Sequence, residues 1–101
     1  LGWEVVGESS DSFDLLDKLN LLVPDVVIID RDLPGMSTKD LVAGIRQDFK
    51  ALVIILLSNS PLEQSRSDKL DVDFFVSKID PPARILDTLL QAESWFESKL
   101  N

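Results

Sequence analysis

The sequence predicts a doubly wound α/β domain, in which helices cover both faces of a parallel sheet. Four short apolar runs alternate with segments of helical periodicity, which is the pattern of consecutive βαβ units. The second and third runs are apolar without alternation, as expected of strands buried on both faces. Polar residues end several runs, and open sheets of this kind bind ligands at the carboxyl ends of their strands.

The apolar runs predict four strands, over residues 3–7, 25–30, 52–57 and 73–77. Each contains Val, Ile or aromatic residues, which are common in strands. A turn at Pro34-Gly35 separates the second strand from the helix that follows it.

Two helices are expected before the third strand. The first has an apolar stripe made of Phe13, Leu15, Leu16 and Leu19. The second begins at Ser37, which has Asp40 three residues further on, at the spacing of a capping box. Its apolar positions are Leu41, Val42 and Ile45.

Two more helices follow the third and fourth strands. A short, polar helix begins at Ser60-Pro61, with Glu63 completing its capping box, and runs to about Leu70. The last helix begins at Asp80-Pro81. Its apolar residues are Ala83, Leu86, Leu89 and Leu90, with Trp95 and Phe96 beyond them.

Composition narrows the classes of function. The chain of 101 residues is one domain at most, and the lack of an initiating Met suggests a fragment, a processed chain or a partial sequence. It contains no Cys and no His, which excludes disulfides, thiol nucleophiles and a phosphohistidine relay. The net charge of −8 argues against nucleic-acid binding. No apolar run is long enough to cross a membrane, and no secretion leader is visible, so we expect a cytoplasmic domain.

An acid, a hydroxyl and an amine end three of the predicted strands. They are Asp30, Ser58 and Lys78. Because the carboxyl ends of parallel strands share one edge, these groups are expected to converge. They suit phosphoryl transfer to a carboxylate, with Asp30 as nucleophile and with Lys78 and Ser58 stabilising charge on the phosphoryl oxygens. Mg²⁺ would normally bridge the carboxylate and the phosphate.

Two separated motifs resemble one protein family. Residues 24–30, with the Leu33-Pro34-Gly35-Met36 loop, resemble the phosphoacceptor strand and loop of bacterial response-regulator receiver domains. Residues 73–78 resemble the fifth strand of these receivers with its Lys, and residues 2–8 their second strand. The resemblance implies a flavodoxin-like sheet of strand order 2-1-3-4-5.

The resemblance also implies a role for each site residue. Asp30 would be the phosphoacceptor and a Mg²⁺ ligand, the backbone carbonyl of Asp32 a second ligand, and Lys78 the partner of the phosphate. Ser58 would be the hydroxyl that ends the fourth strand, although counting back from Lys78 puts that position nearer Leu56 or Leu57. The aromatic side chain of Phe75 would be the switch that reports phosphorylation.

One part of the receiver pattern is missing from residues 1–101. The first strand, which in the family ends in the acidic pair that holds Mg²⁺, and the first helix have no counterpart, and no output domain follows. Residues before Leu1 could supply that strand, the remaining strands could pair differently, or another chain could supply it. Leaving the position empty would expose unpaired strand edges.

These residues leave three candidate functions. The first is a signalling switch and not an enzyme. It takes a phosphoryl group from a sensor histidine kinase, and the added charge changes a face that binds a partner protein or, in a homodimer, a second copy of the chain. The second is a degenerate pseudo-receiver that acts as an interaction or dimerisation module without phosphorylation. The third, a flavin- or nucleotide-binding enzyme, lacks support because neither G-x-G-x-x-G nor a P-loop is present.

Overall fold

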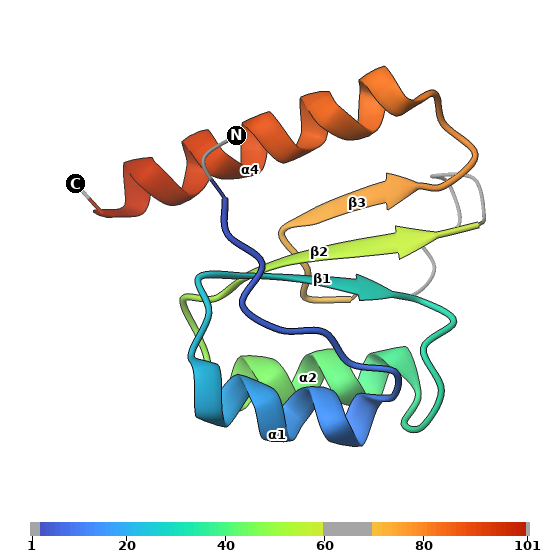
Figure 1. Cartoon of the computed structure of the whole chain (residues 1–101), viewed down its shortest axis with the longest axis vertical. Coiled ribbons are helices and arrows are strands. Elements are labelled where there is room, and N and C mark those ends of the chain that lie inside the picture. Colours follow the sequence, from blue (N-terminus) through green and yellow to red (C-terminus); the bar gives the residue numbers. More distant parts are fainter. Residues whose placement is uncertain (1–2, 60–69, 101) are drawn as a thin grey trace.

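The computed structural model describes residues 3–59 and 70–100 and shows a sheet between two layers of helices (Figure 1). The elements in chain order are α1 (Ser12–Leu22), β1 (Val26–Asp30), α2 (Thr38–Asp48), β2 (Val53–Ser58), β3 (Phe74–Ser77) and α4 (Pro82–Leu100). Among these, no helix is both long and apolar enough to cross a membrane.

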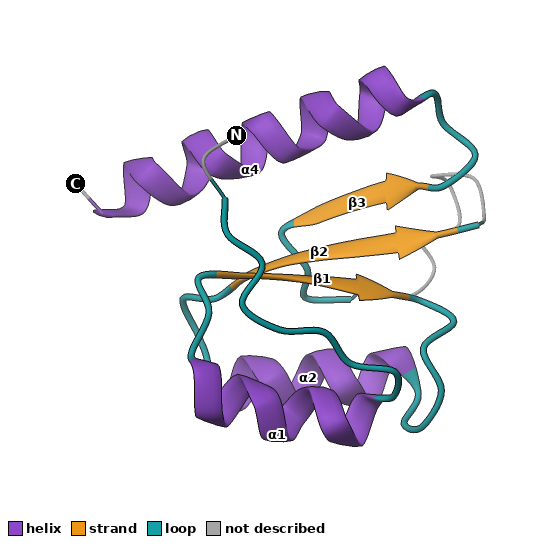
Figure 2. Cartoon of the chain, in the orientation of Figure 1, coloured by secondary structure: helices purple, strands orange, loops and turns teal. Residues whose placement is uncertain are grey.

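The sheet is parallel, with strand order β1-β2-β3. Its register places Asp30 beside Leu57 and Ser58 beside Ser77. Helices α1 and α2 lie against one face and α4 against the other (Figure 2). This confirms the predicted α/β class, and the observed order matches the 3-4-5 part of the expected sheet.

The core lies on both faces of β2. Ile54 and Leu56 pack toward α1 and α2, whereas Val53 and Ile55 pack toward α4, and all four side chains are fully buried. Burying an aliphatic side chain stabilises the fold by about 1.5–3 kcal/mol. The continuous apolar run of the third predicted strand is therefore explained by its central place in the sheet.

Polar caps define where the first two helices begin. The Ser37 hydroxyl accepts a hydrogen bond from the Asp40 backbone N–H at 3.2 Å, as the capping spacing predicts. The Asp11 carboxylate does the same for the Asp14 N–H at 2.9 Å and caps α1. Each bond satisfies a backbone donor that has no partner inside the helix.

The predicted strand over residues 3–7 is wrong: these residues have no strand structure. Trp3 packs against the core cluster beneath α4, while Val5 and Val6 are exposed. An isolated extended segment leaves its backbone groups unpaired, so apolar β-branched residues alone do not make a strand. Within the described residues, β1 has a neighbour on one side only.

The buried helix faces also differ in part from the predicted ones. Leu41, Val42 and Ile45 are buried as predicted, but Phe13 of the expected α1 stripe is exposed.

In α4 the side chains packed on the sheet are Ile85, Leu89 and Ala92. Leu86 and Leu90 are exposed, because a helix turns about 100° per residue and these two lie on its flank.

One further prediction is wrong, and another lies outside the described residues. Ile28 is 45% exposed, so β1 is not buried on both faces. The helix predicted from Ser60 to about Leu70 lies almost entirely outside the described residues, as does the side chain of Phe96.

Candidate functional site

The carboxyl ends of the three strands bring Asp30 and Lys78 together, although 48 positions separate them in the sequence. Asp30 is the last residue of β1, and Lys78 directly follows β3. The Lys78 ammonium donates a hydrogen bond to Asp30 Oδ2 and forms an ion pair with it. Because β2 lies between the two strands, the Lys78 side chain must reach across its end, which the long stem of lysine allows.

The Asp30 carboxylate accepts a second hydrogen bond from the chain that follows it. The Asp32 backbone N–H donates to Asp30 Oδ1 at 2.8 Å. The hydrogen bond from Lys78, and then that from the Asp32 N–H, lower the pKa of Asp30 below its usual value of 3.8. Both donors favour the charged form, so Asp30 is ionised at neutral pH.

Ser58 ends β2 between these two groups and is buried. Its backbone carbonyl accepts a hydrogen bond from the Lys78 N–H at 2.6 Å, which holds the start of the loop after β3 against β2. The register places Leu57 beside Asp30, so Ser58 is one residue beyond the acid. Its predicted role stays a prediction.

Asn59 is a member of this site that the sequence analysis missed. Its side-chain amide donates to Asp32 Oδ2 at 3.0 Å, which joins the loop after β2 to the loop after β1. Its signal was a second polar residue directly after the strand that ends at Ser58. Asn59, Asp32, Asp30 and Lys78 thus form one chain of hydrogen bonds along the strand ends.

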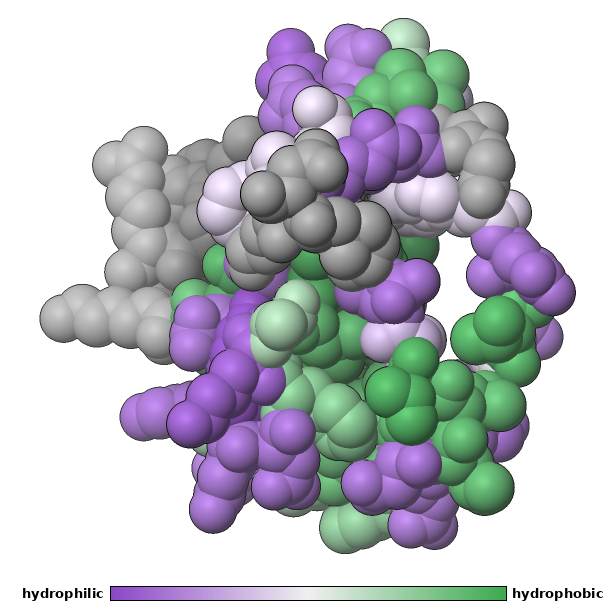
Figure 3. Space-filling view, turned by 90° about the vertical axis from the view of Figure 1, so that its left-hand side faces the viewer, coloured by the Kyte–Doolittle hydropathy of each residue, from purple (hydrophilic) through white to green (hydrophobic). Residues whose placement is uncertain are grey.

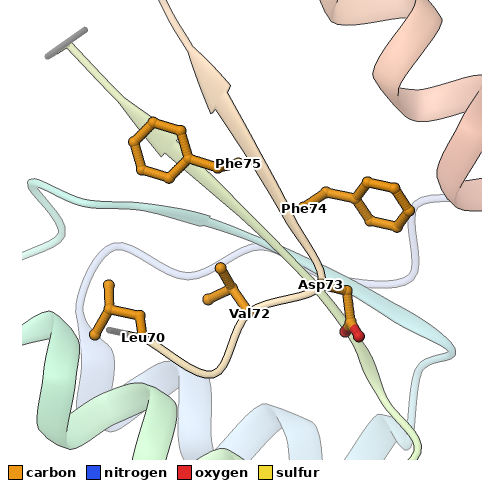
Figure 4. A pocket seen from close by; sticks show the side chains of 5 residues that line it. All are labelled: Leu70, Val72, Asp73, Phe74 and Phe75. Atoms are coloured by element: carbon orange, nitrogen blue, oxygen red, sulfur yellow. The ribbon is translucent and has the colours of Figure 1, made fainter. Parts of the chain in front are cut away.

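Phe75 lies in β3 on the face that α1 and α2 cover, and its side chain is partly buried. Figure 4 shows Phe74 and Phe75 on opposite sides of the strand, with Phe75 in a pocket that Leu70 and Val72 also line. Phe75 is therefore separate from the hydrogen-bonded groups, and its role as a switch stays a prediction.

The described residues suit a metal ion that takes only one or two protein ligands. Among residues 3–59 and 70–100, no three Asp or Glu side chains gather into a cluster. Mg²⁺, however, commonly keeps several waters and takes only one or two protein carboxylates together with phosphate oxygens. Asp30 and Asp32 offer hard oxygen donors at adjacent positions of the site, so these residues fit a largely hydrated Mg²⁺.

Comparison with curated proteins gives a relative among response regulators. The chain is 30% identical over 90 residues to the nitrate/nitrite response regulator protein NarP of Escherichia coli K12. The matched part is 87% of this chain and 42% of NarP, so the chain spans less than half of that relative. No family model matches the chain.

Solved structures of receiver domains share its fold. The REC domain of the response regulator AraT from Geobacillus stearothermophilus matches with a TM-score of 0.81 over 97% of this chain and 78% of that one, at 22% identity. RcsB from Salmonella enterica serovar Typhimurium, bound to promoter rprA with the phosphomimetic BeF₃⁻, matches with a TM-score of 0.78 and 29% identity. That match covers 92% of this chain and 80% of the RcsB chain in that structure. The chain therefore belongs to the receiver domains of two-component response regulators.

Proposed function

We propose that Asp30 accepts a phosphoryl group from the phosphohistidine of a sensor kinase. The observation that carries this proposal is the ion pair between Asp30 and Lys78 at the strand ends. An ionised carboxylate supplies the nucleophile, and the neighbouring ammonium supplies the positive charge that phosphoryl oxygens need.

The transfer is a substitution at phosphorus. An oxygen of Asp30 bonds to phosphorus while the P–N bond to the kinase histidine breaks. The imidazole leaves with the electron pair of that bond and takes up a proton. Lys78 then pairs with a phosphoryl oxygen in place of Asp30 Oδ2, so its positive charge stays at the site throughout.

Asp30 and the backbone carbonyl of Asp32 would hold Mg²⁺ in this site. When bound, the ion neutralises charge on the phosphoryl oxygens. Asn59 donates to Asp32 Oδ2 and so ties the loop that carries this carbonyl to the loop after β2.

The added charge is the signal in this proposal. A phosphoryl group carries up to about two negative charges and three acceptor oxygens. Ser58 and Phe75 would reposition in response, which changes the face formed by β3 and its flanking helices. A partner protein or domain that binds this face would read the change.

A mass measurement tests the transfer. Incubation with a small-molecule phosphodonor and Mg²⁺ should add the mass of one phosphoryl group, and Asp30→Asn should abolish the addition. Asp25→Asn, which changes an exposed acid just before the same strand, is the matched control and should still be modified. No mass shift in the unaltered protein, or a shift that survives Asp30→Asn, would contradict the proposal and favour a phosphorylation-independent interaction module.

We also propose that residues 1–101 are a receiver domain without its first strand and helix, and that a strand fits along the open edge of β1. Two observations support this. Ile28 is exposed in the middle of β1, and the space-filling view has an opening on the side of the sheet that residues 3–9 cross (Figure 3). An unpaired edge beside exposed apolar surface is a template for a further strand.

A further inference from the structure

The first residue of α1 is buried against the loop that follows Asp30. Ser12 has none of its surface exposed. Its backbone N–H donates to the Pro34 carbonyl at 2.9 Å. Its hydroxyl accepts a hydrogen bond from the Met36 N–H at 2.6 Å. Two hydrogen bonds from one buried residue thus join a helix to a loop 24 positions away in the sequence.

These bonds satisfy groups that would otherwise lack partners. The first backbone N–H groups of a helix have no acceptor inside it, and Asp11 caps Asp14, not Ser12. The Pro34 carbonyl serves Ser12 instead. The Met36 N–H lies in a partly buried loop, where loss of its acceptor would carry a desolvation cost.

Gly35 lets the loop approach this closely. Its φ of +111° lies in a region that L side chains rarely adopt. A Cβ at this position would overlap the Ser12 hydroxyl and come within 3.3 Å of the Phe13 ring. Ser12 and Gly35 therefore fit one another, and neither tolerates extra volume.

The other end of the same loop holds the phosphoacceptor. The Asp32 N–H donates to Asp30 Oδ1, and the Leu33 N–H donates to the Asp30 carbonyl at 3.0 Å. The Thr38 hydroxyl, from the start of α2, donates to the Arg31 carbonyl at 3.1 Å. The loop from 31 to 36 is thus held near both ends, with Ser12 as its anchor in α1.

We propose that Ser12 is a positioning residue of the Asp30 site, acting through this loop. It keeps the Asp32 backbone in the place where its N–H meets Asp30 and where its carbonyl could meet a metal ion. Small displacements of positioned groups are costly for reactions that depend on alignment. The consequence for phosphorylation rests on the proposed function above, whereas the anchoring of the loop does not.

The test combines Ser12→Ala with two readouts. The first is amide hydrogen exchange at Asp32 and Met36, measured by NMR at neutral pH. Loss of one neutral hydrogen bond should speed exchange at both amides by about fivefold. Ser94→Ala is the control, since it removes an exposed serine of α4 on the opposite face of the sheet. It should leave both amides unchanged.

The second readout is the rate of phosphorylation at saturating Mg²⁺ and phosphodonor. Ser12→Ala should lower this maximal rate by about fivefold, with circular dichroism unchanged. Gly35→Ala disturbs the same contact from the loop side and should change both readouts in the same direction. Agreement between the two variants would show that the effect comes from this contact and not from some other consequence of the Ser12→Ala substitution.

The two proposals fail in different ways. If the unaltered protein is never phosphorylated, the proposed function fails, and amide exchange still tests the role of Ser12. If Ser12→Ala speeds exchange at Met36 but leaves Asp32 exchange and the phosphorylation rate unchanged, Ser12 is only a structural contact and this inference is overturned.

Discussion

At the scale of single residues, the Asp30–Lys78 ion pair is better suited to chemistry than to stability. The Asp30 and Lys78 side chains are 40% and 32% exposed. Ion pairs this exposed contribute little to the free energy of folding, because water screens them. The same exposure leaves Asp30 accessible to a phosphodonor, and the two hydrogen bonds it accepts keep it ionised.

Lys78→Met should raise the pKa of Asp30 toward the ordinary carboxyl value, because Lys78 is the largest cause of its depression. When the pKa of a carboxyl group is lower in the folded protein than in the unfolded protein, the ionised group stabilises the fold above the unfolded pKa of about 4. This stabilisation is lost as the pH falls through the pKa of the folded protein. Any stability difference between Lys78→Met and the unaltered protein should therefore shrink as the solution is acidified.

Carbon-13 NMR titration of the Asp30 carboxyl, with urea unfolding at neutral and acidic pH, checks this prediction. Lys39→Met, which removes an exposed lysine of α2, is the control and should leave the Asp30 titration unchanged. An Asp30 pKa equal in Lys78→Met and the unaltered protein would show that the ion pair is absent in solution.

At the scale of elements, Arg46 joins α2 to the beginnings of β2 and β3. Its guanidinium forms an ion pair with Asp73 at 2.6 Å and donates to the Leu52 carbonyl at 2.5 Å. The same Asp73 oxygen accepts the Ile54 N–H at 2.8 Å. Both charged side chains are largely buried, so this cluster fixes the end of the sheet opposite the Asp30 site.

Arg46→Met should lower the free energy of unfolding by about 2 kcal/mol, since hydrogen bonds to charged groups are lost and a largely buried carboxylate keeps no cation. Urea denaturation measures the change. Lys18→Met breaks the exposed pair with Asp14 and should have little effect. Equal unfolding midpoints for the two variants would mean that the Arg46 cluster does not contribute to stability.

At the scale of the whole molecule, the described sheet ends at β1 with an open edge. An apolar side chain of β1 lies open beside it, since Ile28 is 45% exposed. Unpaired backbone next to apolar side chains favours pairing with another strand.

We expect the 101-residue chain to self-associate through this edge as its concentration rises. Ile28→Lys should reduce the association, because lysine on an edge strand opposes strand pairing. Sedimentation velocity over a concentration series measures the effect. Leu21→Lys, at an exposed apolar residue of α1, is the control and should associate like the unaltered chain. A chain that stays monomeric at every concentration would contradict this role of the edge.

Local sequence signals predicted three strands, the Ser37 cap and the strand-end residues well. Ser37 caps α2 because a capping hydroxyl acts within one turn. Residues 3–7 resembled a strand yet are not one, because a strand depends on its neighbour as much as on its own residues. Asn59 and Ser12 were missed as site residues, because their partners lie 27 and 24 positions away in the sequence.

The sequence by itself determined the α/β class and the acid and amine that end two strands, because hydrophobic periodicity and strand-end position are local properties. Only the tertiary structure decided that Lys78 reaches Asp30, that Asn59 holds Asp32 and that Ser12 anchors the loop. Such contacts depend on strand register and on the approach of distant segments, which side-chain type alone does not specify.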